Sequence, residues 1–148
     1  YIDTEGGFSL SRLKQLAPDC DSLLENVFLF KPYTFRDQNR VFTGLKDIIS
    51  NCIGLVIIDS IAMLYRLEIG EGKDVDSVNR ELGRQLVYLI GLVRKNKIPI
   101  LITNQVYSDF DNKDKVNIVG GDLLKYSSKC ILELQKFKKL RKSFFVHN

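Results

Sequence analysis

Three short apolar runs of this chain each end in a polar side chain, and this repetition restricts the fold more than any other feature. The runs are YIDTE, LVIID and PILITNQ, and they close on Glu5, Asp59 and Gln105. An apolar run bounded by turn signals is typical of a strand buried in a parallel sheet. Because ligands of open α/β sheets bind beyond the carboxyl ends of the strands, the three side chains predict one nucleotide site.

Strand and helix patterns alternate along the chain, which predicts βαβ units and a mostly parallel sheet flanked by helices. Capping residues and helical spacing of apolar residues predict a short helix over 9–16 and longer helices over 34–50 and 78–97, and a short helical turn is predicted over 60–66. Apolar runs predict strands over 1–4, 27–30, 54–59 and 98–103, with the third buried on both faces, and a C-terminal antiparallel hairpin over 129–134 and 142–146. A mobile loop is predicted over 68–76, and a polar loop over 106–119.

Composition describes a globular α/β domain and excludes several other classes. The chain has 148 residues, 45% hydrophobic and 27% charged, which is enough for one core. No apolar run reaches the ~18 residues needed to span a bilayer, and no signal peptide is expected, so we predict a cytoplasmic protein. Cys20, Cys52 and Cys130 lack the CxxC spacing of a zinc site and are expected to be reduced thiols.

Positive charge is concentrated near the C-terminus. From Lys125 onward there are seven basic residues and one acid, Glu133, within an overall net charge of +4. A polyanion partner or a subunit contact would account for this segment. A solvated lysine-rich turn at 136–142 would also account for it, and composition alone favours that simpler explanation.

The three strand ends carry the residue types that phosphate chemistry needs. Asp59 can orient Mg²⁺ and its waters. Glu5, followed by two glycines, can act as a general base, and Gln105 can bind a γ-phosphate through its amide. Alone, each has a structural explanation: an aspartate that caps the next turn, a glutamate at a surface turn, and an amide that satisfies buried backbone. Their occurrence together favours the nucleotide site.

One part of a nucleotide site is missing from the sequence. No G-x-x-x-x-G-K-[ST] loop occurs, so nothing here would cradle the α- and β-phosphates. The chain begins inside a predicted strand and stops after another strand-like run. We therefore expect residues 1–148 to be a partial nucleotide-binding core whose phosphate loop precedes Tyr1.

The segments YIDTEGGFSLSRL, LVIIDSIAMLYR, ILITNQV and the later GGD together resemble the core of RecA-type recombinases. The similarity lies with the archaeal and eukaryotic branch, and within it most of all with the RadB family of paralogues of the recombinase RadA. It runs in the same order across nearly the whole chain. The resemblance implies a RecA-like P-loop ATPase fold that uses ATP and Mg²⁺ and binds DNA.

The resemblance also implies roles for individual residues. Glu5 matches the catalytic glutamate, Gln105 the glutamine that links the γ-phosphate to the second DNA loop, and Asp59 the Walker B aspartate that holds Mg²⁺ through water. Arg12 matches an arginine that packs on the adenine. The predicted loops 68–76 and 106–119 take the places of the two DNA loops, whose basic residues are Lys73, Lys113 and Lys115.

Departures from active recombinases decide between the functions that the family allows. The second loop is short and acidic, the first loop offers only Lys73 as a cation, and His147 stands where full recombinases carry an aspartate. Because cations supply most DNA affinity, we expect an accessory protein with weak ATPase activity and little strand exchange. It would assist a RadA-type recombinase, with homo-oligomerisation possible. The alternatives are an active DNA-dependent ATPase, recombinase or helicase, and a non-enzymatic scaffold.

Overall fold

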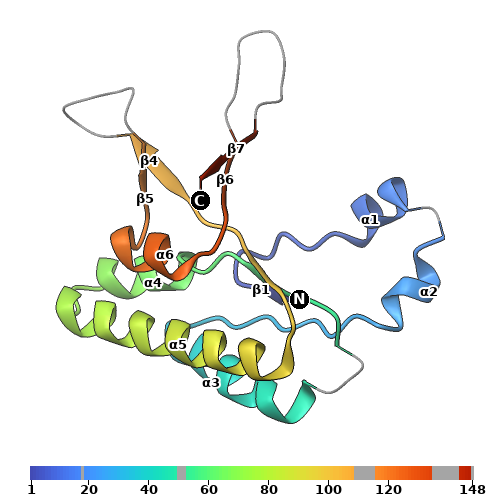
Figure 1. Ribbon diagram of the computed structural model, residues 1–148, viewed down its shortest axis with the longest axis horizontal. Helices are drawn as coiled ribbons and strands as arrows, with labels where there is room; N and C mark the ends of the chain where they lie inside the picture. Colours follow the sequence, from blue (N-terminus) through green and yellow to red (C-terminus); the bar gives the residue numbers. More distant parts are fainter. Residues whose placement is uncertain (18, 50–52, 109–115, 135–143, 148) are drawn as a thin grey trace, which may run out of the picture. The chain divides into compact units, whose positions relative to one another are not determined.

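The computed structural model describes residues 1–17, 19–49, 53–108, 116–134 and 144–147, in two units (Figure 1). The first unit, Tyr1–Gln105, contains β1 Ile2–Asp3, α1 Leu10–Leu16, α2 Asp21–Leu24, α3 Phe35–Ile48, β2 Val56–Asp59, α4 Met63–Gly70, α5 Val75–Asn96 and β3 Ile100–Ile102. The second, Val106–Asn148, contains β4 Val106–Ser108, β5 Val116–Ile118, α6 Gly121–Ser127, β6 Ile131–Leu134 and β7 Phe144–His147.

A parallel sheet of order β1-β2-β3 is the centre of the first unit. Ile58 of β2 stands opposite Ile2 on one side and Ile102 on the other. The same register sets Asp3 beside Asp59 at the carboxyl ends. Parallel strands flanked by helices, followed by antiparallel pairs, confirm the predicted α/β class.

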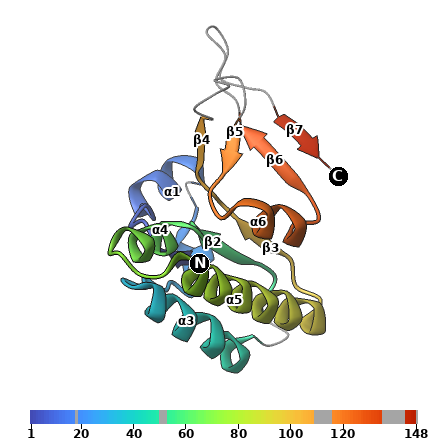
Figure 2. The same cartoon turned by 90° about the vertical axis from the view of Figure 1, so that its left-hand side faces the viewer.

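Three helices, α3, α4 and α5, pack against one another on one side of this sheet (Figure 2). Thr34 caps α3 by accepting a hydrogen bond from the Asp37 amide (3.0 Å), and Asp74 caps α5 by accepting one from the Ser77 amide (3.0 Å). Such caps satisfy amides that the first turn leaves unpaired. The largest fully buried apolar side chains come from the helices, the sheet and the turn between β2 and α4: Phe42, Ile2, Ile58, Ile61, Leu82, Leu86 and Leu89.

Two predicted strands differ from the structure. Residues 54–59 are not buried on both faces, because Val56 and Ile58 are buried whereas Leu55 is 46% exposed. The predicted strand over 27–30 is reduced to a single parallel bridge between Phe30 and Ile2. Pro32 follows two residues later and has no amide hydrogen to extend that ladder.

The predicted loop over 68–76 is wrong in extent. Helix α4 continues to Gly70 and α5 begins at Val75, which leaves a short connection between them. Gly72 adopts a φ of +81° in this connection, a conformation that glycine tolerates at no steric cost. The C-terminal turn of α4 and the start of α5, which Asp74 caps, therefore occupy much of the expected loop.

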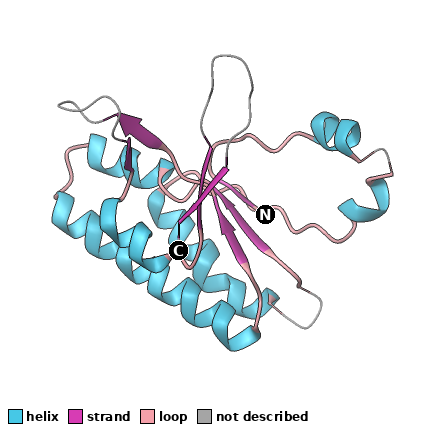
Figure 3. Cartoon of the chain, turned by 45° about the horizontal axis from the view of Figure 1, so that its top comes forward, coloured by secondary structure: helices cyan, strands magenta, loops and turns pink. Residues whose placement is uncertain are grey.

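The second unit contains two antiparallel pairs (Figure 3). The predicted loop over 106–119 is instead a pair of strands, β4 and β5, in which Val106 stands opposite Ile118; residues 109–115 lie outside the described part. The predicted C-terminal hairpin is confirmed by β6 and β7, with Leu132 opposite Val146. The basic segment 136–142 is not among the described residues.

Other sequence expectations concern membranes, metals and thiols. None of the helices in the described part is long and apolar enough to cross a membrane. Those same residues contain no group of three or more His, Cys, Asp or Glu side chains that could hold a metal. Cys20 is a buried free thiol and Cys130 an exposed one, while Cys52 falls outside the described residues.

Candidate active site

Backbone bonds that continue past the strands bring their three carboxyl ends together. The Thr4 amide donates to the Asp59 carbonyl (2.8 Å), the Thr103 amide donates to the Ile58 carbonyl (3.0 Å), and the Ile61 amide donates to the Thr103 carbonyl (3.2 Å). These bonds place the residues that follow each strand at one edge. The edge is the one at which ligands bind in open α/β sheets.

The turn that carries Glu5 is folded around Asp3. Asp3 is a buried residue, only 2% exposed, and its carboxylate accepts hydrogen bonds from the amides of Gly7 (3.0 Å) and Phe8 (3.1 Å). Gly6 has a φ of +72°, which favours glycine over any residue with a Cβ. The chain therefore turns directly after Glu5. Hydrogen bonds hold the backbone before this residue, at Thr4, and after it, at Gly7 and Phe8.

Glu5 forms hydrogen bonds through one carboxylate oxygen to residues that follow the other two strands. Its Oε1 accepts a hydrogen bond from Ser60 Oγ (2.6 Å) and another from Gln105 Nε2 (2.9 Å). Within the described residues no hydrogen bond reaches Oε2. One oxygen is thus fixed while the other can accept a proton, which is the arrangement a general base needs.

Asp59 is held by hydroxyl donors on both of its oxygens. The Tyr1 phenol donates to Oδ2 (2.6 Å), and Thr103 Oγ1 donates to Oδ1 (2.6 Å). Burial raises the pKa of the Tyr1 phenol well above its usual range, and the hydrogen bond to Asp59 raises it further. Each carboxylate oxygen keeps lone-pair capacity beyond one hydrogen bond, so Asp59 fits a role as a water-mediated ligand of Mg²⁺.

Arg66 of α4 completes the polar network. Its Nη1 donates to Gln105 Oε1, while the amide nitrogen of Gln105 faces Glu5. Sequence reasoning missed this arginine, together with Tyr1, Asp3, Ser60 and Thr103. The available signal was proximity: each of the last four lies within four residues of a predicted site residue, and Arg66 lies on the helix that follows Asp59.

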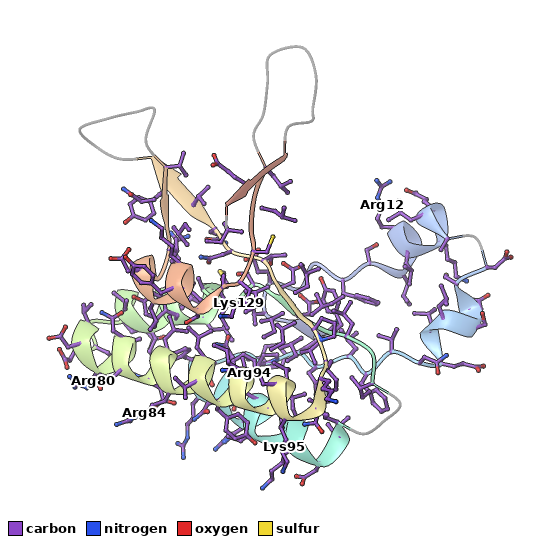
Figure 4. All side chains as sticks on the ribbon, in the orientation of Figure 1. Arg12, Arg80, Arg84, Arg94, Lys95 and Lys129 are labelled. Carbon is purple, nitrogen blue, oxygen red and sulfur yellow. The ribbon has the colours of Figure 1, made fainter. Side chains whose placement is uncertain are left out.

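Arg12 and Lys73, the other predicted site residues that the structure describes, form hydrogen bonds outside this network. Arg12 lies on α1, where its Nη1 donates to Gln15 Oε1 (2.9 Å) (Figure 4). Lys73 lies between α4 and α5 and forms an ion pair with Glu68, whose hydrogen bond raises the pKa of the lysine. Lys113 and Lys115 lie outside the described residues.

Comparison with known proteins places the chain in a family. The family model described as Rad51 matches residues 1–146. The chain belongs to the Rad51 family. The Rad51 match covers both units, and the strand ends that carry Glu5, Asp59 and Gln105 are among the matched residues.

Curated relatives of this Rad51-family chain carry the name "DNA repair and recombination protein RadB". The protein from Methanosphaera stadtmanae is 41% identical over 140 residues, which is 92% of this chain and 59% of that protein. The protein from Methanococcus maripaludis strain C7 is 42% identical over 144 residues, 96% of this chain and 65% of that protein. The chain thus spans less than two thirds of the length of these relatives.

A solved structure agrees with these matches. A crystal structure described as the RadB recombinase superposes with a TM-score of 0.74 at 34% identity and covers 94% of this chain and 63% of that one. The predicted resemblance to RadB proteins and the RecA/Rad51-like fold are confirmed.

Proposed function

We propose that this chain supplies the hydrolysis and sensing half of an ATP site in a DNA recombination accessory protein. The contact between Gln105 Nε2 and Glu5 Oε1 (2.9 Å) is the observation that carries the proposal. It couples a side chain suited to activate water with one suited to report the state of a γ-phosphate. Loss of the phosphate would then change the hydrogen bonding of Gln105, which directly precedes β4 in the sequence.

The residues present fit ATP and Mg²⁺. Mg²⁺ prefers oxygen ligands and keeps several of its waters, and the Asp59 carboxylate would hold the ion through one of them. The bound ion would neutralise charge that develops on the phosphates. Glu5 would accept the proton of the attacking water at Oε2, and Gln105 would donate its amide to the γ-phosphate. Arg12 is assigned to the adenine by resemblance alone.

An accessory role, with weak ATPase activity and little strand exchange, follows from the charge of the connecting segments. Lys73, the basic residue between α4 and α5, is paired with Glu68, and Lys113 and Lys115 alternate with acids in the sequence. Such segments offer little free positive charge to DNA. DNA binding through these lysines and assistance to a RadA-type recombinase therefore belong to the proposal.

The full-length protein tests the proposal through Glu5→Gln, with Glu25→Gln on the exposed end of α2 as the matched control. We expect ATP binding by calorimetry in all three proteins, and slow phosphate release that falls at least ~100-fold in Glu5→Gln only. Fast DNA-stimulated turnover with strand exchange would instead identify an active recombinase or helicase. Absence of ATP binding would identify a scaffold.

A further inference from the structure

We infer that Arg66 is a positioning residue that sets the orientation of the Gln105 amide toward Glu5; the inference rests on the proposed function. An amide side chain has a donor end and an acceptor end, and a half-turn about its last bond exchanges them. Only one orientation lets Gln105 donate to Glu5. What fixes that orientation is therefore part of the site.

Arg66 and Glu5, which carry opposite charges, favour the same orientation of the Gln105 amide. Arg66 Nη1 donates to Gln105 Oε1, and Gln105 Nε2 donates to Glu5 Oε1 (2.9 Å). In the reversed orientation the amide oxygen would face the carboxylate and the amide hydrogens would face the guanidinium. Both contacts would then be repulsive, and hydrogen bonds to charged groups are the stronger kind.

Arg66 is well placed for this task because it comes from a helix. Residue 66 lies inside α4, and its amide donates to the Ala62 carbonyl (3.0 Å). Gln105 follows β3 in a segment without regular structure, so its own backbone restrains the amide less. Arg66 is thus anchored on a helix, and its hydrogen bond restrains the Gln105 side chain, which follows a strand.

Glu5 alone does not hold the Gln105 amide in one orientation during turnover. When Glu5 takes a proton it becomes a neutral carboxylic acid, which can donate as well as accept. The preference of Gln105 for one orientation then weakens on that side. A guanidinium has donors only and no acceptor, so Arg66 keeps the amide oriented throughout the cycle.

The test compares Arg66→Ala, Arg66→Gln and Arg66→Lys in the full-length protein. Arg94→Ala, on the exposed surface of α5, is the control (Figure 4). Side-chain amide signals of ¹⁵N-glutamine-labelled protein, assigned through Gln105→Ala, report the orientation without ATP. We expect the Gln105 amide signal to shift in the Ala and Gln variants, to stay near its wild-type position in Arg66→Lys, and to be unchanged in Arg94→Ala.

Kinetics provide the second readout, with no DNA present, so that lost DNA contact cannot affect the result. We expect Arg66→Ala to lower kcat about tenfold with an unchanged KM for ATP, and Arg66→Lys to restore most of the rate. An unchanged Gln105 signal in Arg66→Ala would overturn the inference, whatever the rate. So would a loss of rate that appears entirely in KM. Failure of the proposed function is separate, since it would appear as absent ATP binding or turnover in the wild type.

Discussion

Thr4 and Ser60 exchange two hydrogen bonds through a single hydroxyl: Thr4 Oγ1 donates to the Ser60 carbonyl (2.7 Å) and accepts from the Ser60 amide (2.8 Å). The two residues are separated by 56 positions and are both buried. The pair joins the end of β1 to the end of β2, and the hydroxyl of the same Ser60 donates to Glu5. This contact fixes the distance between the two acidic strand ends.

Replacing Thr4 by Val should destabilise the protein by about 1–3 kcal/mol, because a buried amide and a carbonyl lose their partner. Thr4→Ser keeps the hydroxyl and should cost about 0.8 kcal/mol, the value of one methyl group. Urea unfolding of the full-length variants measures both changes. A loss for Val that is smaller than the loss for Ser would show that the methyl group, and not the hydroxyl, stabilises this junction.

The Tyr1 phenol should titrate above the usual ~10 for tyrosine, because burial and the hydrogen bond to Asp59 both raise its pKa. The difference between the absorbance titrations of wild type and Tyr1→Phe isolates this group. Asp59→Asn should move its midpoint back toward the usual value. Tyr33→Phe is the control, since Tyr33 is 83% exposed.

The same shift predicts how stability depends on alkaline pH. A pKa that is higher in the folded protein than in the unfolded chain gives stability that is present below the unfolded value and is lost as pH rises through the folded one. The free energy of unfolding should therefore fall more steeply above pH ~10 in wild type than in Tyr1→Phe. Parallel curves for the two proteins would contradict the assignment.

The placement of the three strand-end residues at one edge of the sheet could be predicted because it depends on local pattern. Glu5, Asp59 and Gln105 each follow an apolar run, and a parallel sheet brings such ends to one edge. What the sequence could not predict was the register across the sheet, which brings Tyr1 to Asp59, and the packing of α4, which brings Arg66 to Gln105. Those contacts join residues 58 and 39 positions apart.

The errors in the fold have the same origin. Residues 106–119 look like a polar loop because their strands are three residues long, too short for alternation to be evident. Their stability depends on pairing with each other, which is a non-local property. Residues 27–30 show the opposite case, in which strand-like composition yields one bridge because Pro32 limits the ladder.

Gln38 and Gln85 form a buried polar contact between α3 and α5, with Gln38 Nε2 donating to Gln85 Oε1 (2.9 Å). Gln38 Oε1 has no hydrogen-bond partner among the described residues. Gln38→Met should cost about 1–3 kcal/mol, since it leaves the Gln85 acceptor unpaired, whereas the double replacement by Met should be nearly neutral. A double-mutant cycle in urea measures this coupling, and additive losses would argue against it.

Glu68 should limit the contribution of Lys73 to DNA binding, because the two side chains form an ion pair. Lys73→Ala is therefore expected to change the slope of log affinity against log salt by less than the ~0.7 of a full phosphate contact with single-stranded DNA. Glu68→Gln should free the amine and tighten binding, which anisotropy of labelled single-stranded DNA would measure across a salt series. Glu25→Gln makes the same change of charge on α2 and controls for net charge alone. If both glutamate variants tighten binding equally, long-range charge explains the effect, and the pairing of Lys73 with Glu68 does not.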